Sequence, residues 1–309
     1  MNKEFKIKFR GVRGSYPIAK GEFLKYGGNT SCVEVHVGGQ LVILDAGTGL
    51  VDLGSDLLQG HINSSVNKKE RKNINATLLL SHIHQDHIQG FTFFRPLHLT
   101  STTLNVFGNC DFEEDLAQEL STLLFNKSFP LDLGDVAGLL NIHNLQETEC
   151  IILDGDNTPI IKRIESDETL IPQGNQVIIS CYKSYAHPQN GVIIYKIAYK
   201  DKSLVYATDK ESYIGGDKKL AKFARDCDVL IHDTQYTTED YMDAYIPKQG
   251  YGHSTFEMAL DAQKQIGAKK LVCFHFDPTY NDEKLDKISS EFANESCLFA
   301  REGLEIDLL

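Results

Sequence analysis

The sequence lacks the features that mark a membrane protein, a disulfide-stabilised protein or a protein that coats nucleic acid. No run approaches the roughly eighteen apolar residues that cross a membrane. The seven cysteines are odd in number and include no CxxC pair, which argues against a disulfide framework and a thiolate zinc site. The formal net charge of −12 disfavours binding of nucleic acid, because phosphate backbones are held mainly by clustered Lys and Arg side chains. We therefore expect no membrane partner and no large nucleic acid.

The overall composition is that of a globular enzyme. With 309 residues and 41% hydrophobic content the chain can bury a large core, and we expect a single domain over residues 1–309. The opening MNKEFKIKFRGVRGS holds no apolar run of signal-peptide length, which with the scattered cysteines predicts a cytoplasmic protein. A small anionic substrate stays compatible with the charge, because a bound metal ion reverses the local field. The oligomeric state stays open, with a homodimer as one alternative.

Short β-branched runs alternate with amphipathic helical patterns along the chain. CVEVHVGGQLVILDAG, residues 32–47, predicts a hairpin that turns at Gly38-Gly39. This alternation predicts an α/β fold with about a dozen strands. The helical patterns occupy residues 111–125, 217–226, 255–268 and 282–296.

A faint internal repeat relates the two halves of the chain. In the first half a hairpin ends at Asp45, and the next strand leads into His82. In the second half a hairpin ends at Asp209, and the next strand ends at His232-Asp233. The repeat predicts two related β-rich halves packed face to face, although two ordinary hairpins would give the same pattern.

Two segments are less regular than the rest. Residues 63–75 are polar and basic, which predicts a surface loop between a helix and a strand. Residues 126–175 mix acidic residues with Gly and Pro. This second segment forms either a lid or rim around a pocket or a plain surface insertion.

The stretch SHIHQDHIQG concentrates metal-binding side chains. Three histidines and one aspartate lie between His82 and His87, directly after the apolar run ATLLL. Strand ends are rigid supports for such residues, so these side chains can converge if the strands end at one edge. Imidazole and carboxylate ligands suit zinc, manganese or iron. Further side chains of this type follow other apolar runs: His187, Asp209 and His275.

The spacing within the motif favours two metal ions. His82 and His84 lie two residues apart at an extended strand exit, so both can face one ion. Asp86 and His87 follow where the chain turns towards a helix, and can face a second ion. Four ligands in so short a segment do not fit one tetrahedral centre easily. Two ions about 3.5–4 Å apart can hold a hydroxide between them and stabilise a displacement at phosphorus or carbon.

HIHQDH at 82–87 resembles the HxHxDH signature of the metallo-β-lactamase superfamily, and the later metal-type residues follow in the expected order. The resemblance implies an αββα sandwich, in which two mixed β-sheets pack together with helices outside. It also implies two divalent ions, with zinc expected and manganese or iron as alternatives. The implied ligands are His82, His84 and His187 for one ion, Asp86, His87 and His275 for the other, and Asp209 between them.

YGHSTFEMALDAQKQIGAKKLVCFHFDP resembles the closing signature of the phosphodiesterase branch, which includes tRNase Z and cyclic phosphodiesterases. In that branch a non-ligand histidine precedes the last ligand, which implies that His253 is the former and His275 the latter. RGVRGSYP, YGGNTSCVEV and LVILDAGTGL near the start also resemble bacterial hydrolases of this branch.

Three departures from relatives in the superfamily narrow the expected activity. The chain has no basic, Gly/Pro-rich arm of the kind with which tRNase Z grips tRNA. The β-lactamases of the superfamily have Cys where this chain has Asp209, and its diiron oxygen-handling members have Glu where this chain has His84. The sequence therefore favours a small or cyclic phosphodiester as substrate.

These observations predict a dinuclear metal-dependent phosphodiesterase that works through a metal-bridging hydroxide. Asp86 is expected to orient the nucleophile, and His253 to bind the substrate and stabilise or protonate the leaving oxygen. Asn29 and Thr30 are predicted substrate contacts, although a structural turn explains them equally well. A thioester or lactone hydrolase with the same centre, and a non-catalytic metal-stabilised sensor or scaffold, are the alternatives.

Three further polar residues are expected to support the site rather than form it. His232 in VLIHDTQY is predicted to be a buried structural histidine behind the site. Asp233 and Asp45 end apolar runs and can orient metal ligands through hydrogen bonds, although aspartates at strand ends are often only caps.

Overall fold

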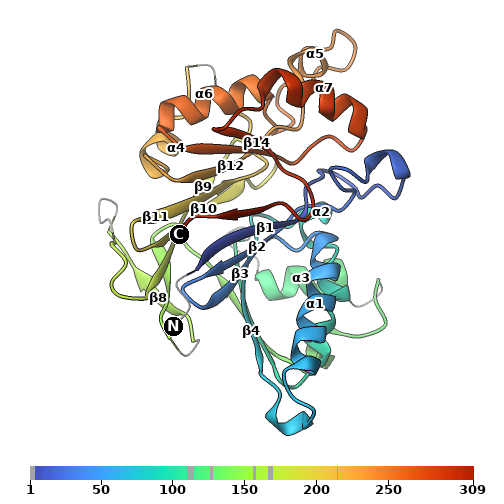
Figure 1. Ribbon diagram of the computed structural model, residues 1–309, viewed down its shortest axis with the longest axis vertical. Coiled ribbons are helices and arrows are strands. Elements are labelled where there is room, and N and C mark those ends of the chain that lie inside the picture. Colours follow the sequence, from blue (N-terminus) through green and yellow to red (C-terminus); the bar gives the residue numbers. More distant parts are fainter. Residues whose placement is uncertain (1–3, 110–114, 126–127, 156–157, 166–169, 214) are drawn as a thin grey trace.

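The computed structural model describes residues 4–109, 115–125, 128–155, 158–165, 170–213 and 215–309. Within these residues the strands form two mixed β-sheets that pack face to face, with helices on the outer face of each sheet (Figure 1). This is the α/β sandwich that the sequence predicts. The seven-stranded sheet has the order β15 (Glu305–Asp307), β1 (Phe5–Gly11), β2 (Cys32–Val37), β3 (Gln40–Leu44), β4 (Ile74–Leu79), β5 (Thr102–Gly108) and β6 (Leu139–Asn144).

The second sheet has eight strands and contains most of the C-terminal half of the chain. Its antiparallel part comprises β7 to β11, and β11 to β14 run parallel to one another. Its spatial order is β14 (Cys297–Phe299), β13 (Lys270–Phe274), β12 (Val229–Asp233), β11 (Lys202–Ala207), β10 (Val192–Tyr199), β9 (Val177–Ser184), β7 (Glu149–Leu153) and β8 (Ile160–Arg163).

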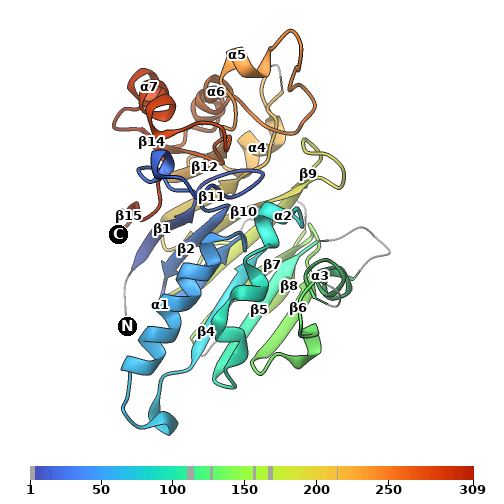
Figure 2. The same ribbon diagram turned by 90° about the vertical axis from the view of Figure 1, so that its right-hand side faces the viewer.

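Helices cover both sheets, as Figure 2 shows from the side. The first sheet carries α1 (Gly49–Asn63) and α3 (Leu116–Leu124), and the second carries α4 (Lys218–Phe223), α6 (Phe256–Ile266) and α7 (Asp282–Phe292). Short helices α2 (Gln85–Ile88) and α5 (Thr238–Tyr241) lie in loops. In the described residues no helix combines the length and apolar character needed to cross a membrane.

The predicted helical patterns correspond to helices that are shorter than the patterns. Three patterns become α4, α6 and α7, and α6 ends at Ile266 and is capped by Gly267, which has a left-handed backbone (φ 75°). Glycine is favoured there because it has no Cβ to clash in this conformation. The pattern at 111–125 becomes α3, although its residues 111–114 lie outside the described part of the chain.

Alternating side chains divide the core into two layers. In β3, Val42 and Leu44 face the second sheet, whereas Ile43 faces the helices outside. The layer between the sheets is continuous with the apolar faces of α4, α6 and α7. The outer layer of the first sheet packs against α1 and α3. The loops therefore begin and end on sheets that are packed between apolar layers.

The two halves of the chain share one topology. β2 and β3 form the predicted hairpin, with positive φ at both Gly38 (59°) and Gly39 (83°), as a two-residue turn of this hand requires. β10 and β11 form the corresponding hairpin of the second half. Each hairpin is followed by a parallel strand, β4 and β12 respectively. Asp45 and Asp209 follow the second strands of the two hairpins, and both have positive φ.

The described part of 126–175 lies mainly at the edges of the sheets. It supplies β6 at one edge of the first sheet, and β7 and β8 at one edge of the second. Phe129 packs against Phe93, which follows the histidine motif in the chain, and the two ring centroids are 5.7 Å apart. A lid or rim role for this segment stays a prediction.

Phe274 joins the two sheets directly below the last predicted ligand. Its buried ring lies 5.9 Å from that of Phe9 and 5.8 Å from that of Tyr206. We expect Phe274→Ala to lower the free energy of unfolding by about 3–5 kcal/mol, because it leaves a cavity between the sheets. Urea denaturation measures this loss. Leu24→Ala, at a side chain that is 79% exposed, is the control and should have little effect; equal losses would contradict the packing role.

Candidate metal centre

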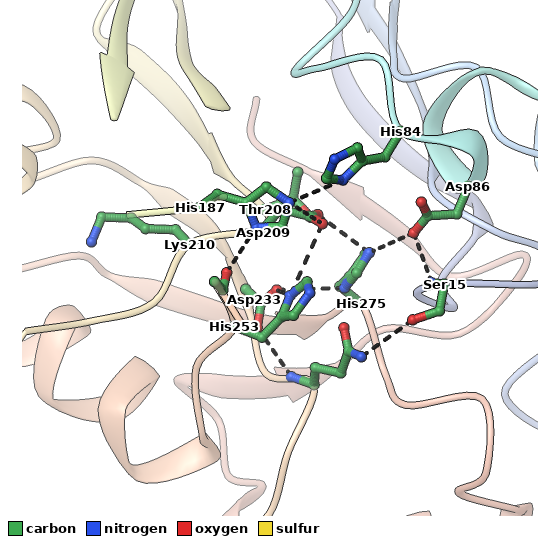
Figure 3. A network of polar contacts seen from close by, with 12 residues as sticks. Ser15, His84, Asp86, His187, Thr208, Asp209, Lys210, Asp233, His253 and His275 are labelled. Atoms are coloured by element: carbon green, nitrogen blue, oxygen red, sulfur yellow. Dashed lines mark hydrogen bonds and ion pairs between the residues drawn. The ribbon is translucent and has the colours of Figure 1, made fainter. Parts of the chain in front are cut away.

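The predicted ligands lie close together where neighbouring strands end. Figure 3 shows five of them, His84, Asp86, His187, Asp209 and His275. The histidine motif follows β4, His187 follows β9, Asp209 follows β11 and His275 follows β13. Loops of this kind are held rigidly at their starting points by the sheets, which is why functional side chains are common there. The seven residues form two groups of side chains whose donor atoms lie within 4.8 Å of one another.

The first group comprises His82, His84 and His187. The Ser81 hydroxyl donates to Asp45 (2.8 Å), so its oxygen accepts from Nδ1 of His82 (3.0 Å). Nε2 of His82 is then a buried nitrogen without a hydrogen-bond partner among the described residues. Such an atom fits a metal ligand, because its lone pair is free and its tautomer is set by the other ring nitrogen.

His187 is held in the same way. Its Nδ1 donates to the carbonyl of Gly252 (3.1 Å), and its Nε2 lies 3.1 Å from Nδ1 of His84. Burial lowers the pKa of His187 to about 4, so the imidazole is neutral at pH 7. A neutral imidazole is the form that binds a metal ion.

The second group comprises Asp86, His87, His275 and one oxygen of Asp209. Nε2 of His87 lies 3.3 Å from Oδ2 of Asp86, and Nε2 of His275 lies 3.1 Å from the same oxygen. The two Nε2 atoms are 3.2 Å apart. Burial disfavours a proton on His275, but the carboxylates of Asp209, Asp233 and Asp86 outweigh it and raise its pKa to about 10.

Asp209 lies between the two groups. Its Oδ1 is 3.7 Å from Nε2 of His82 and 3.9 Å from Nε2 of His187. Its Oδ2 is 3.2 Å from Nε2 of both His87 and His275. Burial alone would raise the pKa of this carboxyl, but the positive charges of His275 and His87 lower it well below its usual range. One ionised oxygen therefore faces each group, as a bridging ligand requires.

Asp45 supports both groups from below. This fully buried carboxylate accepts hydrogen bonds from the Ser81 backbone (2.7 Å), the Ser81 hydroxyl (2.8 Å) and the Tyr206 hydroxyl (2.7 Å). It also accepts from Nδ1 of His87 (2.8 Å), which leaves Nε2 of that ring facing the second group. Asp45 therefore orients Ser81 and His87 through hydrogen bonds, and its support of metal ligands stays a prediction.

Asp233 has the corresponding place beside His253 and His275. Its Oδ2 accepts from Nδ1 of His253 (2.8 Å) and lies 3.4 Å from Nδ1 of His275. Burial alone would raise the pKa of Asp233, but the two histidines lower it to about 2. The rings of His253 and His275 are stacked, with centroids 5.1 Å apart. His253 therefore stands beside the ligands in a fixed orientation.

A third set of potential ligands includes His253. Asp209, Asp233, His253 and His275 also have donor atoms within 4.8 Å of one another. However, Oδ1 of Asp233 accepts from two backbone N–H groups, those of Ser254 (2.9 Å) and Gln235 (3.1 Å), while Oδ2 accepts from His253. A carboxylate with these partners orients imidazoles, and we assign no ion to this set.

The donor set fits divalent cations. Asp45, Asp86, Asp209 and Asp233 are all buried, and within the described residues their ion-pair partners are histidines rather than Lys or Arg. Buried carboxylates are costly unless positive charge compensates them. In the metal-free protein, burial disfavours protons on His87 and His275, but the nearby carboxylates outweigh it and raise the pKa of both, so their protons supply positive charge that a bound divalent ion would displace. Nitrogen and oxygen donors of this kind bind divalent metal ions and do not by themselves select one metal.

Sequence reasoning gave no role to the loop around Gly14 and Ser15. The backbone N–H of Ser15 donates to Oδ2 of Asp86 (2.7 Å), and Ser15 has a positive φ of 63°. Gly14 lies very close to the imidazole ring of His275. The motif RGVRGS contains these residues, but a contact with an aspartate 71 residues later leaves no local pattern.

The predicted substrate contacts lie in the neighbouring loop. Thr30 is fully buried, and its hydroxyl accepts from the backbone of Thr48 (2.9 Å) and from the side chain of Gln89 (3.2 Å). The Asn29 backbone donates to Glu302 (2.7 Å). Thr30 thus connects two loops, and the substrate contacts of both residues stay predictions.

His232 and Lys210 are buried close to the residues of the centre and are not among its predicted ligands. His232 donates from Nδ1 to the backbone oxygen of Asp233 (2.8 Å), and burial lowers its pKa to about 4. Lys210 pairs with Asp217 (2.8 Å), and Figure 3 shows its amine directed away from His187 and His253. Their positions are structural, as predicted for His232.

Gly14 offers a direct test of this geometry. A Cβ at this position would lie 2.4 Å from Cε1 and 2.6 Å from Nδ1 of His275, so the ring would have to move. We expect Gly14→Ala to weaken metal binding by about 10- to 100-fold, as changes beside a ligand commonly do. Titration with Zn²⁺ followed by elemental analysis measures this. Gly21→Ala, where a Cβ meets no atom within 4 Å, is the matched control, and equal affinities in the two variants would contradict this role.

Comparison with known proteins agrees with the predicted fold. The family described as beta-lactamase superfamily domain matches residues 41–276. Ribonuclease Z of Picrophilus torridus is 29% identical over 336 residues, covering 100% of this chain and 97% of that protein. Among solved structures, the metallo-beta-lactamase fold protein YhfI from Bacillus subtilis is 18% identical, with a TM-score of 0.63 and coverage of 98% of this chain and 99% of that one. A diphosphatase from the PhnP family is 15% identical, with a TM-score of 0.63 and coverage of 99% and 98%. Because the family match spans most of the chain, the chain belongs to the beta-lactamase superfamily and is a metal-dependent hydrolase with the metallo-β-lactamase fold.

Proposed function

We propose that the protein is a dinuclear metal-dependent phosphodiesterase that acts on a small or cyclic phosphodiester. The observation that carries this proposal is Asp209, whose two oxygens face two separate groups of buried ligands. Bound there, two divalent ions would supply an activated water and offset negative charge on the phosphoryl oxygens.

His253 is proposed to serve the leaving oxygen. Its Nδ1 is committed to Asp233, so Nε2 is the atom that can hold a proton for the substrate. The Asp233 carboxylate stabilises the positive charge that the ring carries while both nitrogens are protonated. The stacked ring of His275 and the perpendicular ring of Tyr236 keep His253 in one plane. A proton donor held in this way can protonate the leaving oxygen, which then does not depart as an unstable anion.

Asp86 is proposed to orient the attacking water. Its Oδ2 accepts a hydrogen bond from the backbone N–H of Ser15 (2.7 Å), which fixes the orientation of the carboxylate. Burial alone would raise the pKa of Asp86, but the charge of His87 and the hydrogen bond from His275 lower it well below its usual range. An ionised carboxylate is the form that can accept a hydrogen bond from water.

The charge around the site favours a small substrate. The loop at 234–255, which carries His253, contains three acidic residues and only one Lys, Lys248. Long phosphate backbones are held by clusters of Lys and Arg, and this loop offers none. Processing of a large RNA is the second candidate, and the full-length similarity to ribonuclease Z is the observation that favours it.

Substitution of His253 tests the proposed proton donor. We expect His253→Ala to keep its metal and to lower kcat roughly 10²- to 10⁴-fold for a phosphodiester with an alkoxide leaving group. The loss should be much smaller with p-nitrophenolate, which leaves without a proton. Elemental analysis and the two rate measurements settle the assignment. Loss of metal from His253→Ala, or equal losses of kcat with both leaving groups, would contradict this assignment. His98→Ala, at an exposed histidine to which we assign no function, is the control.

A substrate panel tests the activity itself. It comprises bis(p-nitrophenyl) phosphate, 2′,3′- and 3′,5′-cyclic nucleotides, an RNA with a 3′ extension, a thioester and a lactone, each with and without a chelator. We expect chelator-sensitive hydrolysis of the small diesters. Preference for the RNA would favour the second candidate. Activity only on the thioester or lactone would replace a phosphodiesterase by a carbonyl hydrolase, and absence of any chelator-sensitive activity would favour a sensor or scaffold.

A further inference from the structure

The exposed tyrosines of this protein are not scattered over its surface. Each of those in the described residues lies on a loop that also carries a residue of the metal centre or its support. Tyr185 (72% exposed) comes two residues before His187, and Tyr251 (49% exposed) comes two residues before His253. The complete set is Tyr16, Tyr185, Tyr213, Tyr245 and Tyr251. Exposed tyrosines are therefore concentrated on the loops that carry the candidate site, although isolated exposed aromatics would need no explanation.

Tyr185 and Tyr213 line a hollow whose wall also includes His187 of the first group. The hollow has a volume of about 580 Å³ and therefore lies next to one of the candidate metal ligands. This volume lies in the usual range for small-molecule sites. Its other walls include Tyr185, Pro188, Gln189, Tyr213, Tyr241 and Gly250.

The loops around the hollow are held in place by a carboxylate. Glu211, two residues after Asp209, accepts hydrogen bonds from the backbone of Gly250 (2.9 Å) and Gly252 (3.1 Å), and from the hydroxyl of Tyr241. The turn that carries Tyr251 is thereby attached to the loop that carries the bridging ligand. A preorganised wall of this kind binds a planar group without first having to order itself.

A positive charge lies near His253. The Lys248 ammonium is 5.4 Å from the ring centroid of Tyr251 and 6.0 Å from that of Tyr236, which in turn packs edge-on against His253. A cation in this position can interact with a phosphate or a ring on a bound ligand. The loop that carries His253 thus combines aromatic rings with one cation.

We propose that the hollow holds a nucleobase stacked on Tyr185, so that the substrate is a nucleotide phosphodiester. This inference rests on the proposed phosphodiesterase function. Every base has a π-face, and stacking on an aromatic side chain contributes about 1–3 kcal/mol per base. A base in the hollow would place its sugar phosphate towards His187 and the ions. Because the loop with Lys248 is otherwise acidic, the substrate is a mononucleotide or short nucleotide ester rather than a long strand.

Two substrates with the same leaving group isolate the contribution of the base. Thymidine 5′-(p-nitrophenyl phosphate) and methyl p-nitrophenyl phosphate differ in the nucleoside alone. We expect Tyr185→Leu to lower the ratio of their kcat/KM values roughly tenfold or more, mainly through KM for the thymidine ester. Tyr185→Phe, which keeps the aromatic face, should keep the ratio. An unchanged ratio in Tyr185→Leu, or an equal fall in Tyr185→Phe, would overturn the inference.

Binding can be followed without turnover by the fluorescence of an introduced tryptophan. The signal is unambiguous because the chain itself contains no tryptophan. Tyr185→Trp places a single fluorescent ring in the hollow, and adenosine monophosphate should quench it saturably. Val66→Trp is the control, at a fully exposed side chain in the loop between α1 and β4, at the opposite end of the molecule from α5 (Figures 1 and 2). No quenching at position 185, or equal quenching at both positions, would overturn the inference.

The two sets of measurements also separate this inference from the function on which it rests. If methyl p-nitrophenyl phosphate shows no metal-dependent hydrolysis, the proposed phosphodiesterase fails, while the quenching experiment still reports on the hollow. If hydrolysis is present and both tyrosine experiments are negative, the nucleobase site alone fails. Sedimentation tests a competing occupant: a wild-type dimer that Tyr185→Leu abolishes would assign the hollow to a second copy of the chain and overturn the proposal.

Discussion

The buried carboxylate of Asp45 is the interaction on which the metal centre depends. It lies in the interior without access to water, so every one of its hydrogen-bond donors must come from the protein. Those donors are Ser81 and His87 from the histidine motif and Tyr206 from the opposite sheet. Satisfying this one group therefore joins the two sheets and turns Nε2 of His82 and His87 towards the ligand groups. Packing of the sandwich and assembly of the centre are thus coupled.

Asp233 extends the same principle to the far side of the centre. Asp45 holds His87 through Nδ1 and His82 through Ser81, while Asp233 holds His253 through Nδ1 and lies 3.4 Å from Nδ1 of His275. A histidine with a committed Nδ1 has its tautomer and its ring orientation decided. The orientation of these histidines is therefore set by the protein itself, and the two oxygens of Asp209 face two separate groups.

The sheets and the loops divide the work of the protein. Strand ends position the ligands, which explains how one fold supports relatives with different substrates. The loops beyond those ends carry exposed tyrosines, acidic side chains and Lys248. Glu211 connects two of these loops, since it follows Asp209 and holds the turn before His253. The proposed chemistry and the proposed substrate contacts thereby involve residues that are neighbours in the chain.

Local patterns in the chain were sufficient to predict an α/β fold, the Gly38-Gly39 turn and the clustering of ligand-type side chains, because strand periodicity, turn chemistry and the spacing of HIHQDH act over a few residues. The αββα arrangement of the two sheets was implied by the family resemblance and not by these patterns. Other contacts were beyond such patterns. Ser15 reaches Asp86 across 71 residues, and Tyr206 reaches Asp45 across 161. The hollow beside His187 is likewise formed by loops that are distant in sequence. These contacts depend on which loops the packed sheets bring together, and only the tertiary structure decides that, since the burial of each polar group selects its partner in space.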